Sequence, residues 1–165
     1  MGQRMAAKRS YTVGLISDTH GLLRPEAVAA LRGSDYIVHA GDIGSPDILP
    51  ALAELAPVTA IRGNNDRDPW AAGLAETAVL AVGDCLLYVL HSLAGIDRDP
   101  AAAGFRVVVS GHSHRPDWRE AGGVLYVNPG SAGPRRFTLP IAVGRLVVDG
   151  DRVTPQLIEL EPGRG

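Results

Sequence analysis

The sequence predicts an α/β fold made of one domain, and three observations lead to this class. Apolar strands alternate with helical segments through residues 11–62, an order typical of parallel βαβ units. Strand pairs joined by short polar turns follow, so hairpins are expected in the second half. Hydrophobic residues form 45% of the 165 residues, which supplies enough apolar surface for a packed core. Because no repeat or linker interrupts the chain, we predict one domain over residues 11–160, a disordered leader (1–10) and a tail (161–165).

Residues 11–62 carry the expected parallel units. Their strands are apolar runs with β-branched residues, as in strands buried on both faces, and cover residues 11–17, 36–40 and 58–62. A helix over residues 25–31 begins with Pro25, which suits a first helical position. A second helix is expected after Ser45, which we assign as its cap, and its apolar face consists of Ile48, Leu49, Leu52 and Leu55.

The second half carries shorter strands and tighter turns. Gly83 and Asp84 form a hairpin-type turn, and a second turn spans residues 149–151. Cys85 is the only cysteine, so it can form no internal disulfide, and we interpret it as a small apolar residue within a strand. The strands are expected at residues 78–82, 85–90, 105–110, 124–127, 141–148 and 153–160.

Polar residues gather where five of these strands end. Glycines beside them allow sharp turns and the close approach of a substrate. The carboxyl ends of strands in an open α/β sheet share one edge, so these side chains are expected to meet despite their separation in sequence. They are Asp18, His20, Asp42, Asn64, His91, His112 and His114. His39 lies inside a strand and is interpreted as a packed residue that supports the site.

This set combines carboxylate, amide and imidazole groups, and it includes no thiolate. Such oxygen and nitrogen donors suit Mn, Fe, Ni, Co or Zn ions. A single Asp-x-His or His-x-His pair is more often an ordinary turn or a hydrogen-bonded histidine. Here four of the five histidines fall at strand ends beside Asp18, Asp42 and Asn64, and this co-occurrence favours a metal centre.

The charge and the N-terminal sequence exclude several classes of function. A net charge of −2 argues against a broad nucleic-acid-binding surface, which would need an excess of basic residues. The basic residues near the N-terminus are followed by no apolar signal region, and no run is long enough to span a membrane. We therefore expect a cytoplasmic protein.

The order of these motifs resembles that of the calcineurin-like metallophosphoesterase superfamily. They read Asp-Thr-His-Gly, Gly-Asp, Gly-Asn-x-Asp, a single His and Gly-His-Ser-His, and the resemblance spans roughly residues 11–160. Residues 128–131 (Asn-Pro-Gly-Ser), followed by Pro134 and Arg135, resemble the small single-domain phosphodiesterases of bacteria and archaea. This resemblance implies a four-layer α/β/β/α sandwich, in which two mixed β-sheets are flanked by helices.

The resemblance also implies a centre of two divalent metal ions that hydrolyses a phosphodiester. Manganese is the expected metal, with Ni, Fe, Zn, Co or Mg as alternatives, and a hydroxide bridging the two ions would attack the phosphorus. By motif, one ion would be held by Asp18, His20 and His114 and the other by Asn64, His91 and His112, with Asp42 bridging both. The residues expected to act in catalysis are Asp42, Asn64 and Asn65.

Two positions depart from the family pattern. Asn65 stands where many members have a histidine that acts as a general acid, and an amide can donate a hydrogen bond to a phosphoryl oxygen but not a proton. Esters with good leaving groups are therefore expected to react best. Ser92 follows His91 where glycine is usual, and residues 93–104 form a short stretch for this branch, with surface charges at Asp97, Arg98 and Asp99.

The sequence leaves alternatives open. A phosphomonoesterase or a nucleotide hydrolase would use the same metal centre on another small phosphoester. A scaffold protein of this fold in the eukaryotic retromer complex has its ligand positions replaced. Here all seven positions hold metal-competent residues, which disfavours a non-catalytic protein-interaction role. Arg135 faces either a bound phosphate or solvent, and the oligomeric state stays undetermined.

Overall fold

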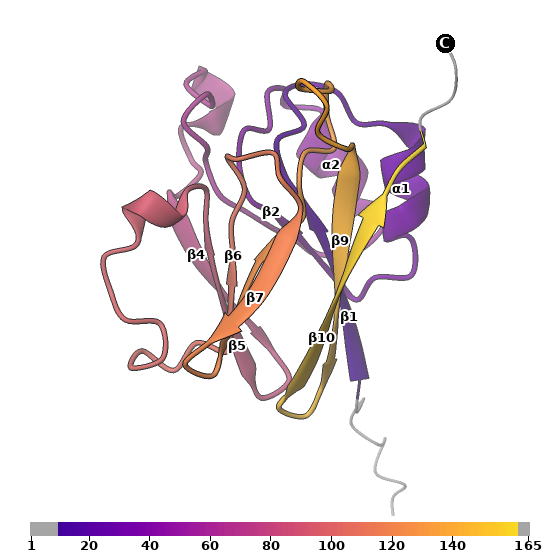
Figure 1. Cartoon of the computed structure of the whole chain (residues 1–165). Helices are drawn as coiled ribbons and strands as arrows, with labels where there is room; N and C mark the ends of the chain where they lie inside the picture. Colours follow the sequence, from indigo (N-terminus) through magenta and orange to yellow (C-terminus); the bar gives the residue numbers. More distant parts are fainter. Residues whose placement is uncertain (1–9, 162–165) are drawn as a thin grey trace, which may run out of the picture.

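The computed structural model describes residues 10–161, which form two five-stranded sheets packed face to face (Figure 1). The first sheet consists of β1 (Ser10–Ile16), β2 (Tyr36–His39), β3 (Val58–Ala60), β9 (Ala142–Asp149) and β10 (Arg152–Glu159), in the order β10-β9-β1-β2-β3. The second consists of β4 (Thr77–Val82), β5 (Cys85–Leu90), β6 (Val107–Val109), β7 (Asp117–Ala121) and β8 (Val124–Asn128), in the order β4-β5-β6-β8-β7. Apart from Ser10 and Glu161, the predicted leader and tail lie outside the described residues.

Both sheets are mixed, as the change from parallel units to hairpins predicts. In the first sheet β1, β2 and β3 are parallel, and the β9–β10 hairpin joins β1 in antiparallel register. In the second sheet β5, β6 and β8 are parallel, with β4 and β7 antiparallel at the two edges. The turn at Gly83 and Asp84 joins β4 to β5, as expected. Cys85 is buried in the core, in agreement with its interpretation as an apolar strand residue.

The main core lies between the two sheets. Leu15 and Val38 of the first sheet meet Val89 and Val109 of the second, and all four side chains are fully buried. Burial of each such side chain contributes about 1.5–3 kcal/mol relative to its exposure. The alternation within β4, half-buried against exposed, shows that this edge strand covers the core with one face only.

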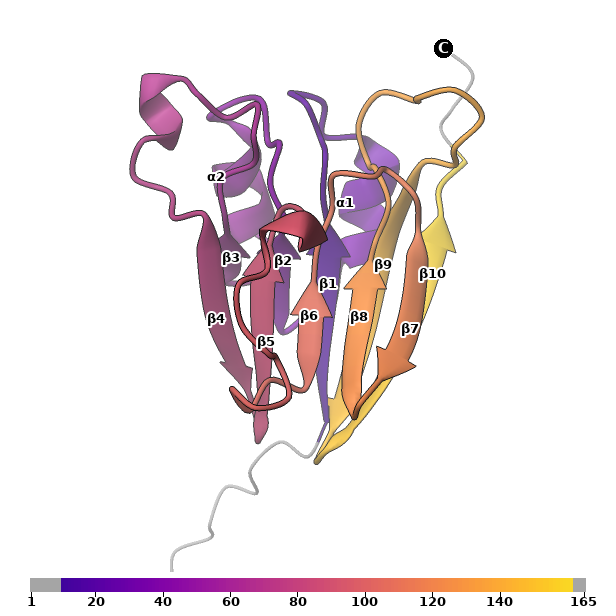
Figure 2. The ribbon, with the colours of Figure 1, turned by 60° about the vertical axis from the view of Figure 1, so that its left-hand side comes forward.

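Two helices cover the outer face of the first sheet (Figure 2). They are α1 (Pro25–Leu31) and α2 (Ile48–Ala53), and a second core cluster forms beneath them from Leu31, Leu52 and Ile37. α1 begins at Pro25, as predicted. The assignment of Ser45 as the cap of α2 is wrong. The helix begins at Ile48, and Asp47 takes the cap position in helical geometry without a side-chain capping bond, while the Ser45 hydroxyl oxygen accepts the Asp47 amide at 3.4 Å in the turn before the helix.

The outer face of the second sheet is covered differently. Its smaller cluster, built around Tyr88 and Phe105, lies under the segment 91–106, whose regular structure is the 3₁₀ turn η2 (Leu93–Gly95). The predicted α/β class and two-sheet sandwich are confirmed, but the fourth layer of described residues is mostly irregular. Residues 93–104 are too few, and too rich in Gly, Pro and charge, to form a long helix.

The strand β7 and two short 3₁₀ turns were not predicted from the sequence. All five residues of β7 are exposed, so no apolar alternation marks it, and it is held by antiparallel pairing with β8 at the sheet edge. The two turns are η1 (Pro69–Ala71) and η2. Within residues 10–161 the structure contains no helix that is long and apolar enough to cross a membrane.

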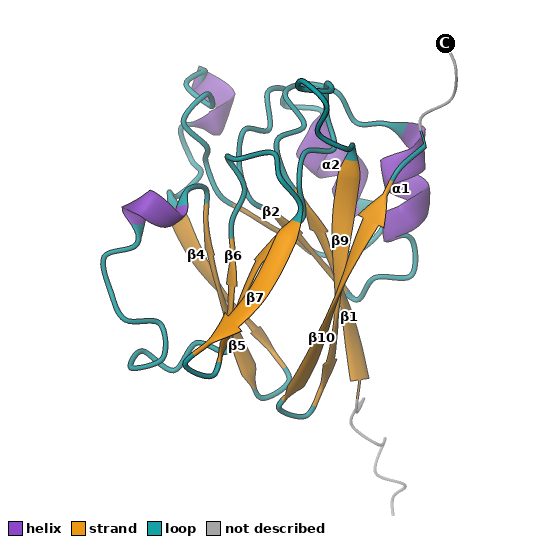
Figure 3. Cartoon of the chain, in the orientation of Figure 1, coloured by secondary structure: helices purple, strands orange, loops and turns teal. Residues whose placement is uncertain are grey.

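The carboxyl ends of β1, β2, β3, β5 and β6 lie at the same end of the sandwich (Figure 2). The strand ends that carry the predicted polar residues therefore lie at one end of the molecule, as expected, although they come from two sheets rather than one. Figure 3 shows that this end is built from loops and short helical turns. Polar side chains there can be positioned without interrupting a strand ladder.

Candidate metal centre

Backbone hydrogen bonds join the loops that carry the predicted ligands. The Asp18 amide donates to the Gly41 carbonyl at 3.0 Å, and the His20 amide donates to the Asp42 carbonyl at 2.9 Å, so the loops after β1 and β2 run side by side. In the second sheet the Gly111 amide donates to the His91 carbonyl at 2.9 Å. These backbone bonds join the ligand-bearing loops in two pairs, one pair at the end of each sheet.

Asp18 links the two sheets and is fully buried. Its Oδ2 accepts hydrogen bonds from the Ser17 hydroxyl at 2.7 Å and from the His112 backbone amide at 3.0 Å. Its Oδ1 accepts none, although the atom is buried. Instead, this free oxygen faces imidazole Nε2 atoms of three predicted ligands, namely His20 at 3.8 Å, His91 at 3.8 Å and His114 at 3.4 Å.

Asp42 presents a second buried carboxylate to the same space. Asn65 holds it twice, because its backbone amide donates to Oδ1 at 2.9 Å and its side-chain amide donates to Oδ2 at 3.0 Å. Oδ2 also lies 3.7 Å from Nε2 of His20 and 3.2 Å from Nε2 of His91. Burial works to raise the pKa of Asp42, but the contact with His91 and the Asn65 amide outweigh it and lower this pKa to about 2.

The position of Asp42 between His20 and His91 fits the predicted bridging carboxylate. Asp18 reaches the same two histidines, so the distances do not single out Asp42. Two sets of three residues each bring their donor atoms within 4.8 Å of one another, and Asp18 belongs to both sets. The first set is Asp18, His20 and His114, and the second is Asp18, Asp42 and His91. The bridging role of Asp42 therefore stays a prediction.

The hydrogen bonds of His91 determine which of its nitrogens faces the site. Its Nδ1 lies 2.7 Å from the Ala40 carbonyl oxygen, and a carbonyl can only accept, so Nδ1 carries the proton. In the neutral ring, Nε2 then presents a lone pair to Asp42 Oδ2. Burial works to lower the pKa of His91, while Asp42 and Ala40 raise it above the ordinary value. The neutral ring and the carboxylate are two facing acceptors that repel each other, and either a proton on Nε2 or a metal ion bound by both groups removes this repulsion.

Four buried atoms in this cluster lack any hydrogen-bond partner among the described residues. A buried polar atom without a partner costs about 1–3 kcal/mol, and three of the four lie within 3.8 Å of Asp18 Oδ1 or are that atom, so the cluster is suited to a ligand. All four belong to predicted metal ligands, and they are Asp18 Oδ1, His20 Nε2, His91 Nε2 and His114 Nδ1. The donors are carboxylate oxygens and imidazole nitrogens, which fits divalent transition metals. The residues present therefore suit the metal ions that the motifs imply.

The backbone at these positions is strained. Among the described residues, six positions other than glycine have a positive φ, and five of them are predicted ligands: Asp18, His20, Asp42, His112 and His114. Such left-handed geometry costs about 1–3 kcal/mol per residue and tends to occur at functional sites. Asp and His are found in it several-fold more often than most residues. The left-handed backbone at these five positions could not be predicted from the sequence, because glycine is the usual marker of positive φ.

Asn64 and His112 lie at the exposed rim of the cluster. The His112 ring contacts that of His91 edge-on, with centroids 5.1 Å apart, and both residues border a hollow with Asn64. The Asn65 side chain was expected to reach a phosphoryl oxygen, but its amide points at Asp42. Arg135 is exposed, while Arg136 lies near enough for its charge to add to burial in lowering the pKa of His114.

The sequence reading assigned no role to Asp66, which supports the site from below. Its buried carboxylate accepts the backbone amides of Ile43, Gly44 and Gly63 at 3.0–3.1 Å, and so joins the loop of Asp42 to the loop of Asn64. The signal was present as the last residue of the Gly-Asn-x-Asp motif. A buried acid satisfied by three amides cannot be distinguished in sequence from a turn residue.

His39 is packed, in agreement with its interpretation. Gly41 donates its amide to Nδ1 at 3.1 Å, which leaves the proton on Nε2 to bond the Thr19 hydroxyl at 3.0 Å. Thr19 in turn donates to the Ile43 carbonyl at 2.8 Å. Burial, followed by repulsion from His91, lowers the pKa of His39 to about 3. Both ring nitrogens are used within the protein, so His39 has none left for a metal.

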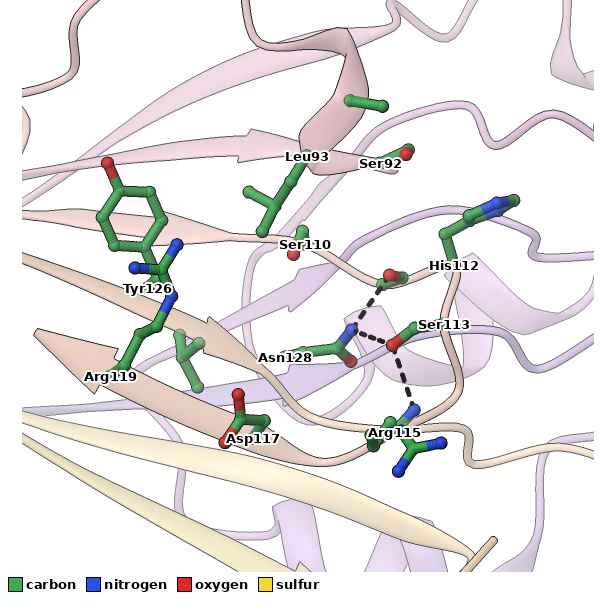
Figure 4. Close-up of a pocket in the computed structure, with 13 residues that line it drawn as sticks. Ser92, Leu93, Ser110, His112, Ser113, Arg115, Asp117, Arg119, Tyr126 and Asn128 are labelled. Carbon is green, nitrogen blue, oxygen red and sulfur yellow. Dashed lines mark hydrogen bonds between the residues drawn. The ribbon is translucent and has the colours of Figure 1, made fainter.

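Two hollows flank this cluster and meet at Ser92 and His112. The first, of about 260 Å³, runs from η2 to β7 and β8. Figure 4 shows His112 at one end of it and Arg119 with Tyr126 at the other. The second, of about 370 Å³, lies beside β4 and includes Arg62, Asn64 and His91. The stretch 93–104 thus contributes Leu93, Ala94 and Gly95 to the walls in addition to its surface charges.

Comparison with known proteins assigns the family. Residues 12–151 match the family model of the calcineurin-like phosphoesterase superfamily domain, and the chain belongs to this superfamily. A relative from Methanothermobacter thermautotrophicus, named a probable metallophosphoesterase, is 36% identical over 167 residues, covering 88% of this chain and 91% of that protein. The resemblance inferred from the motifs is confirmed.

Solved structures show the same fold. An archaeal phosphodiesterase shares 21% identity over 89% of this chain and 99% of its own, with a TM-score of 0.69. Vacuolar protein sorting 29 from Cryptosporidium parvum shares 17% identity over 92% of this chain and 98% of its own, with a TM-score of 0.74. At these identities the likeness concerns architecture alone.

Proposed function

We propose that the protein hydrolyses phosphodiesters with two divalent metal ions held at the rim of the sandwich. The observation that carries this proposal is the convergence of Nε2 atoms from His20, His91 and His114, carried by loops of both sheets, on the buried and partnerless Oδ1 of Asp18. Two bound ions would act as Lewis acids toward the phosphoryl oxygens and lower the pKa of a water between them toward about 7. The ligands would be Asp18, His20 and His114 for one ion, Asn64, His91 and His112 for the other, and Asp42 between them.

The chain itself fixes the geometry of these donors. Ser17 and the His112 amide hold Asp18 so that Oδ1 faces the site, and the Ala40 carbonyl does the same for Nε2 of His91. Asn65 orients Asp42 through two hydrogen bonds. Donors that need no rearrangement lose little entropy when they bind metal ions. Ions held in fixed positions can then stabilise the negative charge that develops on the phosphoryl oxygens in the transition state.

The two hollows support a diester rather than a monoester. A phosphodiester carries two organic arms, whereas a monoester carries one. The hollows share Ser92 and His112, so a phosphate bound beside His112 has a separate space on each side for an arm. The proposal therefore assigns one hollow to each arm.

The test combines metal analysis with a substrate panel. The protein, stripped with a chelator and reloaded with Mn, Ni, Zn or Mg, is expected to bind two ions per chain and to hydrolyse bis(p-nitrophenyl) phosphate faster than p-nitrophenyl phosphate. Equal or faster monoester hydrolysis would show that the diester assignment is wrong. If the protein binds no metal and hydrolyses neither ester, the result would favour a non-catalytic scaffold.

Asn65 provides a prediction about the leaving group. Asn65→His introduces a side chain that can donate a proton, and general acids typically contribute about 10²–10⁴-fold. We expect kcat/KM for alkyl diesters to rise about tenfold or more relative to that for nitrophenyl diesters. Asn65→Ala is the control, since it removes the bond to Asp42 without adding a donor. If both variants change the two substrate classes equally, the account of the missing acid is wrong.

A further inference from the structure

We propose that the hollow between η2 and strands β7 and β8 binds a substrate arm that ends in an anionic group, a phosphate or a carboxylate. This inference rests on the proposed function, because it concerns the arm of an ester attacked at the metal centre. It goes further by naming the chemical class of that arm.

Two arginines give this hollow its charge. Arg115 and Arg119 both line it, and Asp117 is the only acidic residue among the lining residues. Within residues 10–161 neither guanidinium forms an ion pair or a side-chain hydrogen bond. Arg119 lies on the Tyr126 ring, 4.7 Å from its centroid, and this contact leaves the donor edges of the guanidinium free. Unpaired guanidiniums in a concave site are suited to bidentate binding of phosphate or carboxylate.

The second hollow lacks this free charge. Its arginine, Arg62, is paired with Glu76 at 3.2 Å, and both residues line the hollow. A substrate that spans the site is therefore expected to place its neutral arm beside β4 and its anionic arm beside β7. The difference gives an unsymmetrical diester one preferred orientation.

The position and size of the first hollow limit the arm to a short one. Gly111 and His112 form its end next to the metal centre, and Figure 4 shows Arg119 at the far end. Its volume of about 260 Å³ is below that of most ligand pockets, so it holds a short chain or a small ring. Leu93 supplies an apolar wall for the carbon atoms.

The wall nearest the metal centre is held in place by hydrogen bonds. The Asn128 side-chain amide donates to the Gly111 carbonyl at 2.9 Å and to the Ser113 hydroxyl at 3.0 Å, and the Arg115 backbone amide also donates to Ser113 at 3.2 Å (Figure 4). Arg115 therefore begins from a fixed backbone position. Because these residues are already ordered, little of the binding free energy is lost in ordering them when a ligand binds.

The experiment compares three p-nitrophenyl phosphodiesters that differ only in the second arm: propyl, 2-carboxyethyl and 3-phosphopropyl. With the metal-loaded protein, kcat/KM is expected to be about tenfold higher for each anionic arm than for propyl, as one charge-assisted hydrogen bond gives. Arg115→Gln and Arg119→Gln should each reduce this ratio about threefold or more, while Arg119→Lys should retain part of it. Arg152→Gln, an exposed arginine on β10, is the matched control and should leave the ratio unchanged.

The outcomes separate this inference from the function on which it rests. Hydrolysis of the propyl diester without any preference for anionic arms would overturn the subsite and leave the phosphodiesterase proposal intact. If no diester is hydrolysed with any metal, the function fails, and calorimetric titration with 1,3-propanediol bisphosphate then decides the anion site. Equal affinity in the wild type and in the Arg115→Gln, Arg119→Gln double variant would reject it.

Discussion

Replacing Asp42 with alanine is expected to reduce diester hydrolysis by at least about 10³-fold. Metal centres contribute several kcal/mol of transition-state stabilisation, and each 1.4 kcal/mol corresponds to a factor of ten in rate. Asp42 is buried, stays ionised with a pKa lowered to about 2, and lies between His20 and His91. The variant is also expected to lose one of the two proposed metal ions. Steady-state kinetics at saturating Mn and elemental analysis of the same sample measure both effects.

Two controls keep this prediction specific. Asp47→Ala removes an exposed carboxylate from the same loop, one that makes no capping bond, and should leave activity and metal content unchanged. Asp42→Asn preserves the shape of the side chain, so its melting temperature without metal checks that the fold is intact. Near-native turnover of Asp42→Ala with two ions bound would disprove the bridging role.

Replacing Gly63 with alanine is expected to damage the centre without touching a donor atom. A Cβ at this position would overlap the backbone nitrogen and the Oδ1 of Asp42, and a shift of Oδ1 would disturb the hydrogen bond that it accepts from the Asn65 amide. Overpacking of this kind costs about 1–3 kcal/mol in the free energy of unfolding. Displacement of a ligand by about 1 Å can cost about 10²-fold in rate. Urea unfolding and kinetics at saturating metal test the two effects.

Gly73→Ala is the matched control for Gly63→Ala. A Cβ at Gly73 would meet no atom within 4 Å, and its φ is not in the left-handed region. Alanine there should change the free energy of unfolding by less than about 1 kcal/mol, with a slight stabilisation expected from the stiffer unfolded chain. If both glycine variants show the same free energy of unfolding and the same rate of hydrolysis, the close approach of Gly63 to Asp42 does not matter for activity.

The sequence was sufficient to predict most of the strands that carry the site because β1, β2, β5 and β6 are largely buried, whereas β3 is a half-buried edge strand. Buried strands appear as unbroken apolar runs, and a polar residue at the end of each run is conspicuous. For the same reason β7 was missed, since a fully exposed edge strand has no apolar pattern. The family resemblance supplied the second sheet, which the strand pattern alone did not separate from the first.

Other features of the site depend on distances that no sequence pattern encodes. The two hydrogen bonds from Asn65 to Asp42 and the three backbone amides around Asp66 arise only after the loops have folded together. The hollow with Arg115 and Arg119 was missed because those arginines lie in the region of the unpredicted strand. Contacts between residues distant in sequence decide all of these.

The left-handed backbone at five predicted ligands sets activity against stability. Glycine would relax each of these positions, and it would also remove the donor atom that the position exists to present. A variant selected only for resistance to heat would therefore be drawn toward substitutions that silence the enzyme. Substitutions that raise thermal stability without loss of activity are therefore expected at other positions, for example on the outer face of the second sheet, which is covered mostly by irregular structure.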